Sequence, residues 1–161
     1  MIEGSNGGYH VSGRGDHGHA HGRLQDSPNR LLGAVLGVVY VLVGLIGFAV
    51  TGFDGFADTD TNDKVIFFEV NGLANVVHIG VGALLLFSAM KSVAAAKGSN
   101  VLVGAIYLAL GIIGLFILDS DLNILSLNSP DNLLHLASAA VLLGVGLSMD
   151  KNVRRDSPIN G

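Results

Sequence analysis

The sequence contains no cysteine and few charged residues, and both absences restrict what the protein can be. Without cysteine there is no disulfide framework and no thiol chemistry, so redox usage does not indicate the compartment. Only 14% of the residues are charged, well below the quarter that is usual in soluble proteins, while 50% are hydrophobic. The sequence also lacks a nucleophile–base pair, a glycine-rich phosphate loop and an intact cluster of metal ligands. We therefore expect no enzymatic activity.

Four long apolar segments account for most of the hydrophobicity. They cover residues 31–50, 71–90, 101–118 and 133–149. A helix rises about 1.5 Å per residue, so segments of this length cross a hydrocarbon core of roughly 30 Å. They are too long for strands and too apolar for the core helices of a soluble protein. We predict an all-α integral membrane protein whose four-helix bundle occupies residues 30–150, with acidic loops at residues 51–70 and 119–130 and a short loop at residues 91–100.

The bundle is flanked by two polar tails. Residues 1–29 are rich in glycine and histidine and have almost no apolar periodicity, which predicts a flexible tail. This tail is not expected to be a signal peptide, because its first apolar segment starts only after residue 30. Its histidines could bind transition metals weakly or simply belong to a solvated linker: His10, His17, His19 and His21. Residues 151–161 form a short basic tail.

The positive charges predict the orientation in the membrane. Eight of the 9 cations lie in the tails and the middle loop, whereas the two outer loops are acidic and contain only Lys64. The positive-inside rule then places both termini in the cytoplasm and both acidic loops outside. The eight cations are Arg14, Arg23, Arg30, Lys91, Lys97, Lys151, Arg154 and Arg155. We expect a multi-pass protein of the cytoplasmic membrane.

The two halves of the bundle resemble each other in sequence. The first and third spans share Gly-x-x-Tyr-x-x-x-Gly-x-x-Gly, starting at Gly37 and at Gly104, and Gly33 adds another small residue to the first span. The second and fourth spans share Asn-x-x-x-Asn-x-x-His, starting at Asn71 and at Asn128. A duplicated two-helix hairpin explains both matches, and it predicts a parallel repeat about an axis along the membrane normal. The shared glycines, together with Tyr40 and Tyr107, are interpreted as residues that pack the helices closely.

The Asn/His motif places three polar side chains on one face of each even span. These residues are Asn71, Asn75 and His78 in one span, and Asn128, Asn132 and His135 in the other. Asn71 and Asn128 lie at the outer ends, where they can cap the helices, and Pro130 and Asp131 suit a helix start. Polar side chains deeper in the membrane are costly unless they face partners inside the bundle.

Three interpretations of this stripe remain open. It could be a polar knot, in which the two sets of Asn and His hydrogen-bond across the bundle. His78 and His135 could instead be the axial ligands of a haem b, although the outer loops offer only Lys64 to pair with propionates. The stripe could also relay protons or carry ions or small solutes, although no carboxylate is expected inside the membrane beside it.

The first outer loop contains part of a calcium-binding pattern. Asp58, Asp60, Asn62 and Glu69 have the spacing of EF-hand ligands at loop positions 1, 3, 5 and 12. The glycine that this loop needs at position 6 is replaced by Asp63. The pattern predicts either a weak outer calcium site or a solvated acidic loop.

The four spans and the paired Asn/His motifs resemble a family of small actinobacterial membrane proteins known as domain of unknown function 4383. The resemblance covers about residues 29–149. Asn71, Asn75 and His78 match the segment that opens the even spans in that family, as do Asn128, Asn132, His135 and Leu136. This chain departs from the family in having Gly72 where a proline is usual. The resemblance implies a location in the cytoplasmic membrane and no assigned activity.

Taken together, these features predict a non-enzymatic accessory or structural subunit. We expect it to contact membrane lipid, to dock on a larger membrane complex or on a second copy of itself, and to bind no nucleic acid. The alternatives are an ion, proton or small-solute carrier that uses the Asn/His stripe, and a haem b protein.

Overall fold

A computed structural model describes residues 23–53, 55–59 and 61–151. It contains four long helices: α1 (Pro28–Thr51), α2 (Gly72–Lys91), α3 (Val93–Ile117) and α4 (Ser129–Ser148). Each is long and apolar enough to cross a membrane, which confirms the predicted all-α membrane protein. The smaller elements are η1 (Leu24–Asp26) and a two-stranded antiparallel hairpin, β1 (Lys64–Val65) with β2 (Phe68–Glu69). The histidines of the N-terminal tail, and Arg154 and Arg155, lie outside the described residues.

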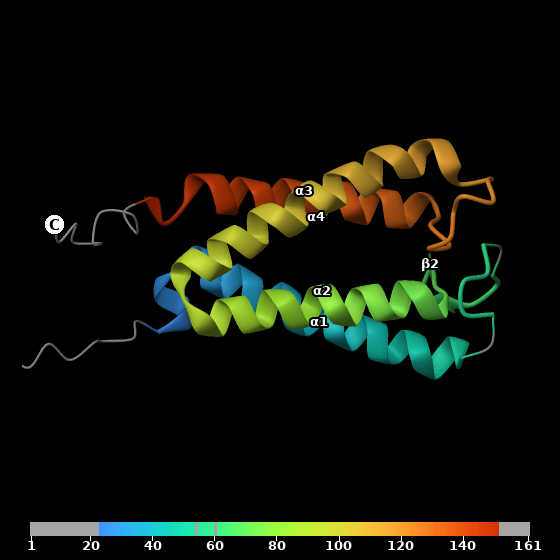
Figure 1. The fold of residues 1–161 in the computed structure, drawn as a ribbon, viewed down its shortest axis with the longest axis horizontal. Coiled ribbons are helices and arrows are strands. Elements are labelled where there is room, and N and C mark those ends of the chain that lie inside the picture. The colour runs from blue at the N-terminus through green and yellow to red at the C-terminus, as the bar shows by residue number, and fades with distance from the viewer. Residues whose placement is uncertain (1–22, 54, 60, 152–161) are drawn as a thin grey trace, which may run out of the picture.

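The helices are arranged as two pairs. α1 packs mainly on α2, and α3 packs mainly on α4, with fewer contacts between the pairs. In Figure 1 the two pairs lie one above the other, and the hairpin strand β2 lies at the right between them. Both predicted outer loops are at this end of the bundle. The start of α1, the junction of α2 with α3 and the end of α4 are at the opposite end.

The predicted loop at residues 91–100 is wrong. Only Ser92 separates α2 from α3, and α3 begins at Val93. The physical reason is local: Ser92 has an extended backbone, and its hydroxyl accepts a hydrogen bond from the Ala95 backbone N–H, so it caps α3. Three consecutive alanines then favour helix. The low hydropathy around Lys97 and Asn100 marks the polar end of a helix here, and not a loop.

Glycine allows the two helices of each pair to approach closely. A Cβ added to Gly37 would lie 2.8 Å from the carbonyl oxygen of Gly82 and from the backbone nitrogen of Leu86. In the second pair, a Cβ on Gly104 would lie 2.9 Å from Leu143. The predicted packing role of these glycines is therefore confirmed. Gly37 with Leu86 and Gly104 with Leu143 occupy matching positions of the sequence repeat, as a duplicated hairpin would require.

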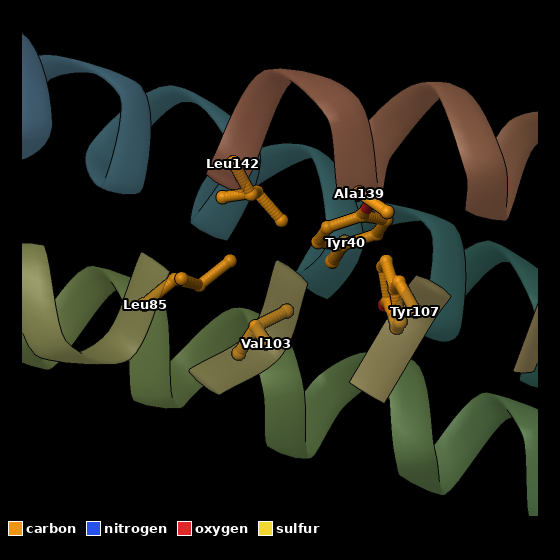
Figure 2. Packing of buried hydrophobic residues seen from close by; sticks show 6 residues of the cluster. All are labelled: Tyr40, Leu85, Val103, Tyr107, Ala139 and Leu142. Carbon is orange, nitrogen blue, oxygen red and sulfur yellow. The ribbon is translucent and has the colours of Figure 1, made fainter. Parts of the chain in front are cut away.

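An apolar layer closes the middle of the bundle. Leu85, Val103, Ala139 and Leu142 come from three helices, and each is 0–1% exposed. Figure 2 shows them pointing toward one another beside Tyr40 and Tyr107. Burying several aliphatic side chains stabilises packing through close contact even where lipid is the solvent. The layer separates the polar interior on the loop side from the polar groups at the opposite end.

A hydrogen-bonded clasp ties the ends of α1, α3 and α4 together at that opposite end. The carboxylate of Asp150 accepts hydrogen bonds from the Ser27 hydroxyl at 2.9 Å and from the Asn29 amide at 2.8 Å. The Asn100 amide donates to the Asn29 side-chain oxygen at 3.0 Å. Asn29 and Asn100 are both 0% exposed. Asp150 follows α4 and also accepts from the Asn29 backbone N–H, so it satisfies a free donor in the first turn of α1.

Candidate functional site in the polar interior

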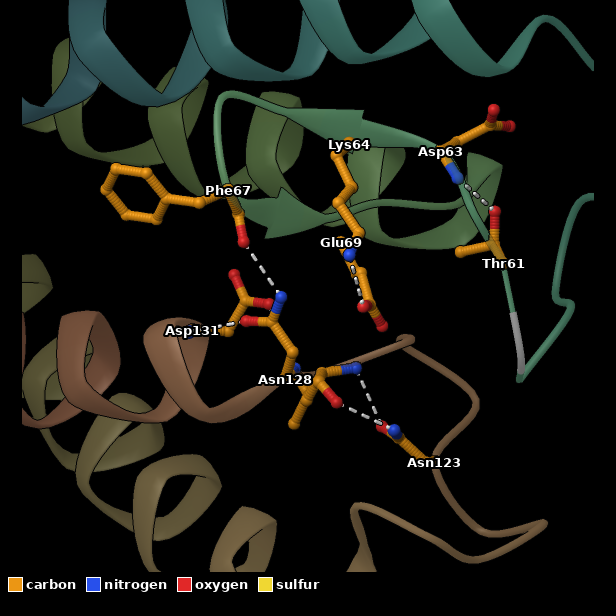
Figure 3. Close-up of polar contacts among 9 residues, drawn as sticks. Thr61, Asp63, Lys64, Phe67, Glu69, Asn123, Asn128 and Asp131 are labelled. Atoms are coloured by element: carbon orange, nitrogen blue, oxygen red, sulfur yellow. Dashed lines mark hydrogen bonds and ion pairs between the residues drawn. The ribbon is translucent and has the colours of Figure 1, made fainter.

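Asn71 and Asn128 begin α2 and α4 and connect the two halves of the protein. Each side-chain oxygen accepts a hydrogen bond from the backbone three residues on, so both asparagines cap their helices as predicted. The Asn71 amide also donates to the Ile124 carbonyl at 2.9 Å, and the Asn128 amide donates to the Phe67 carbonyl at 2.9 Å. Figure 3 shows the Asn128 contact beneath the hairpin. Each asparagine thus binds the outer loop of the opposite half.

Asn75 and Asn132 lie one turn deeper, each packed on a glycine of its partner helix. A Cβ on Gly47 would overlap the amide of Asn75, and one on Gly114 would overlap the amide of Asn132. The two sites differ in their hydrogen bonds. The Asn75 amide donates to the Thr51 hydroxyl at 3.1 Å, whereas both amide atoms of Asn132 are buried without a partner. Position 118, which corresponds to Thr51 in the repeat, is Leu118 and offers no hydroxyl.

The two histidines belong to a cluster of four rings, in which the two imidazoles also interact electrostatically with each other. The His78 ring stacks on Tyr40 with centroids 6.0 Å apart, Tyr40 meets Tyr107 edge-on at 5.5 Å, and Tyr107 contacts His135 at 4.9 Å. The Tyr40 hydroxyl donates to the Ser138 hydroxyl at 2.9 Å. Ser138 is not among the residues predicted from the sequence, although its place three residues after His135 puts it on the same helix face. The tyrosines therefore join the two Asn/His stripes.

This arrangement changes the polar-knot hypothesis. The outermost asparagines do bond across the two halves, but they reach loop carbonyls and not each other. At the deeper level Nδ1 of His78 and Nδ1 of His135 are buried without a hydrogen-bond partner. Ring packing replaces the predicted hydrogen bonds there. Each imidazole packs on a tyrosine ring, His78 on Tyr40 and His135 on Tyr107.

Asp131 is a functional candidate as well as a residue suited to a helix start, although the sequence predicts no carboxylate inside the membrane beside the stripe. The structure places it one helical turn from His135, and it is only 7% exposed. Its carboxylate accepts from the Asn128 backbone N–H at 3.0 Å and from the backbone of Glu69. The spacing of four between Asp131 and His135 was the available signal.

The predicted calcium ligands are only partly described. Asp60 lies outside the described residues, and Glu69 forms a 3.2 Å salt bridge with Lys64, its register partner in the hairpin. Within residues 23–53, 55–59 and 61–151 no group of three or more His, Asp or Glu side chains could hold a metal ion. A polar cavity of about 340 Å³ does lie between the two outer loops. Its lining residues are Thr59, Glu69, Leu118, Asp119, Ser120, Asp121 and Asn123.

A family comparison agrees with this architecture. The sequence model of the domain of unknown function (DUF4383) matches residues 30–148, which include α2, α3, α4, all but the first two residues of α1, and both Asn/His motifs. The chain belongs to the DUF4383 family. The match ends near the last residue of α4, so the membrane domain of this DUF4383 protein is the part that the family defines. No curated protein and no solved structure gives a significant match to the chain.

Proposed function

We propose that this DUF4383 protein is a non-enzymatic accessory or structural subunit that docks on a larger membrane complex or on a second copy of itself. The observation that carries the proposal is the apolar layer formed by Leu85, Val103, Ala139 and Leu142. It fills the centre of the bundle, so the interior offers no continuous polar route across the membrane. The surfaces left for function are the helix faces in contact with lipid and the outer loops.

We further propose that the protein lies in the cytoplasmic membrane with the Asp150 end inside. The charges support this orientation. Arg30, Lys91 and Lys97 lie near the end of the bundle where α1 begins and α2 meets α3, whereas Lys64 lies in the outer hairpin, paired with Glu69. Lipid contact itself follows from the four membrane-spanning helices.

Purification in a mild detergent tests the docking proposal. The tagged full-length protein should elute as a complex of defined stoichiometry, and mass spectrometry should identify either a second membrane protein or only this chain in multiple copies. A suitable variant is Gly144→Leu, because open space surrounds Gly144 on the outside of α4. It should weaken the complex if that face docks, without lowering the thermal stability of the isolated chain. A monomer that carries only lipid at all detergent concentrations would refute the proposal.

A second candidate is a carrier for protons, ions or small solutes. The specific observation in its favour is the buried carboxylate of Asp131 near the unpartnered polar atoms of Asn132 and His135. A carrier would have to open the apolar layer during transport. Flux measured across proteoliposomes, compared with that of the double variant His78→Ala/His135→Ala, separates the two candidates: a pure docking subunit gives the same background flux in both. We propose no resident haem or calcium ion for either function.

A further inference from the structure

The loop-side half of the bundle contains buried polar atoms that have no hydrogen-bond partner among the described residues. They include both amide atoms of Asn132 and Nδ1 of His135, and in the other half of the repeat Oδ1 of Asn75 and Nδ1 of His78. Asn132 is 2% exposed and His135 is 7% exposed. Each unpaired polar group in such a place costs about 1–3 kcal/mol, and a membrane offers no solvent to reduce that cost. The atoms of Asn132 and His135 are therefore free to bind a small polar species such as a water molecule or a proton.

Asp131 supplies a titratable group between these atoms and the outside. Helix capping does not require a carboxylate at position 131. In α2 the matching position is Ala74, and the helix is nevertheless capped by Asn71. The two halves therefore share the cap but not the carboxylate. Side chains of a helix lean toward its N-terminus, so the His135 ring is directed toward the turn that carries Asp131.

The cluster of rings extends from His135 across the bundle and not along it. Tyr107 from α3, Tyr40 from α1 and His78 from α2 face this interior, and the apolar layer lies beyond them. On the outer side Asp131 is faced by Glu69, which is paired with Lys64. The titratable groups thus lie between the outer loops and the apolar layer.

We propose that the loop-side half of the bundle is a proton-binding site, with Asp131 as the entry group and the His135–Tyr107 pair as the acceptor. An outside proton binds a carboxylate oxygen of Asp131 and passes by way of a water molecule to the lone pair of His135 Nδ1, because the carboxylate itself is turned back to the Asn128 backbone N–H. The transfer leaves the Asp131 carboxylate and a His135 imidazolium against the Tyr107 ring, whose π face stabilises the charge. The carboxylate is then available for the next proton. This site works independently of what the protein docks on.

Tyrosine fluorescence can test the site directly. The chain has no tryptophan and only 3 tyrosines, so a Tyr9→Phe background leaves Tyr40 and Tyr107 as the only emitters. In proteoliposomes, acidifying the loop side between about pH 8 and pH 4 should reduce their emission as the adjacent imidazole gains a proton. His135→Gln should abolish the change, and Asp131→Asn should slow its onset after a rapid pH jump by a factor on the order of 100.

His78→Gln is the matched control, because His78 stacks on Tyr40 whereas His135 contacts Tyr107, so this variant should leave the response of Tyr107 in place. Acidifying only the opposite side should change nothing. An emission that is constant over this pH range, or that changes equally in His135→Gln, would overturn the proposal. If His135→Gln does not fold, ¹⁵N histidine NMR on a chain with the tail histidines replaced provides the same answer, since His78 and His135 are then the only signals. A spectrum without a titrating histidine would also overturn it.

Discussion

The Asn71 side chain donates a hydrogen bond to the Ile124 carbonyl, 53 residues away in the sequence, while its own oxygen caps α2. Asn128 likewise donates to the Phe67 carbonyl, while its own oxygen caps α4. Asn128 lies 57 residues after Asn71, and Phe67 lies 57 residues before Ile124, as the two-fold arrangement of a duplicated hairpin would require. One type of side chain thus begins two helices and joins the two halves.

Replacing Asn71 by alanine should destabilise the protein more than the loss of an ordinary cap. A cap is worth about 1 kcal/mol, and the loss of bonds to the Asp58 and Ile124 carbonyls should add to it. Ser92→Ala is the matched control, because Ser92 caps α3 from an exposed position with a single bond. Denaturation by heat in detergent, followed by circular dichroism, measures both. Equal losses would show that the bonds between the halves contribute nothing.

The glycines should divide into two classes. Gly37→Ala should destabilise the bundle by about 1–3 kcal/mol, because the new Cβ would meet the α2 backbone 2.8 Å away. Gly144→Ala should instead stabilise it by up to about 1 kcal/mol, since nothing lies within 4 Å and alanine favours helix. The same melting experiment compares them, and a harmless Gly37→Ala would disprove the close approach of α1 to α2.

Leu118→Thr should give Asn132 the partner that Thr51 gives to Asn75. One hydrogen bond to a buried amide should stabilise the protein by about 0.5–1.5 kcal/mol. Leu118→Val has a similar shape without the hydroxyl and serves as the control. If threonine and valine behave alike in the melting experiment, positions 51 and 118 are not structurally equivalent.

The Asp150 clasp should make stability depend on pH in the acid range. Although partial burial acts in the opposite direction, hydrogen bonds from Asn29 and Ser27 and the nearby Lys97 hold the pKa of Asp150 below its ordinary value. A carboxylate with a lowered pKa stabilises the folded state above its unfolded pKa, and this contribution is lost as the pH falls through the folded value. Asp150→Asn should therefore lower the melting temperature at pH 7.

The asparagine variant should lose its disadvantage at acid pH, where Asp150 itself is protonated. Asparagine suits the left-handed backbone of this position, where φ is 51°, so the comparison isolates the charge. Melting curves of both proteins recorded from neutral to acid pH provide the test. A constant difference over the whole range would mean that the charge of Asp150 is not involved.

The absence of cysteine makes the proposed orientation simple to test. In intact cells, a membrane-impermeant maleimide should label Ser120→Cys in the second outer loop and should not label Lys151→Cys after α4. Permeabilised cells provide the control, because both variants should then react. The opposite labelling pattern would reverse the orientation inferred from the positive charges.

The sequence by itself determined the four spans, the helix caps at Asn71 and Asn128 and the close-packing role of the repeated glycines. These features follow from local properties, since hydropathy, capping chemistry and small-residue spacing act over one or two helical turns. The same local signals misplaced the start of α3. The polar residues near Lys97 lower the hydropathy without ending the helix, and only the extended backbone of Ser92 shows where the chain turns.

Only the tertiary structure decided which residues meet inside the bundle. It packed Tyr40 on His78 and Tyr107 on His135, left the Asn132 amide without a partner and buried Asp131 beneath the outer hairpin. None of this follows from periodicity, because a stripe on a helix indicates which residues face inward but not what the neighbouring helices present to them. Pairs such as Tyr40 and Ser138 are 98 residues apart, and their contact depends on how the two helix pairs pack.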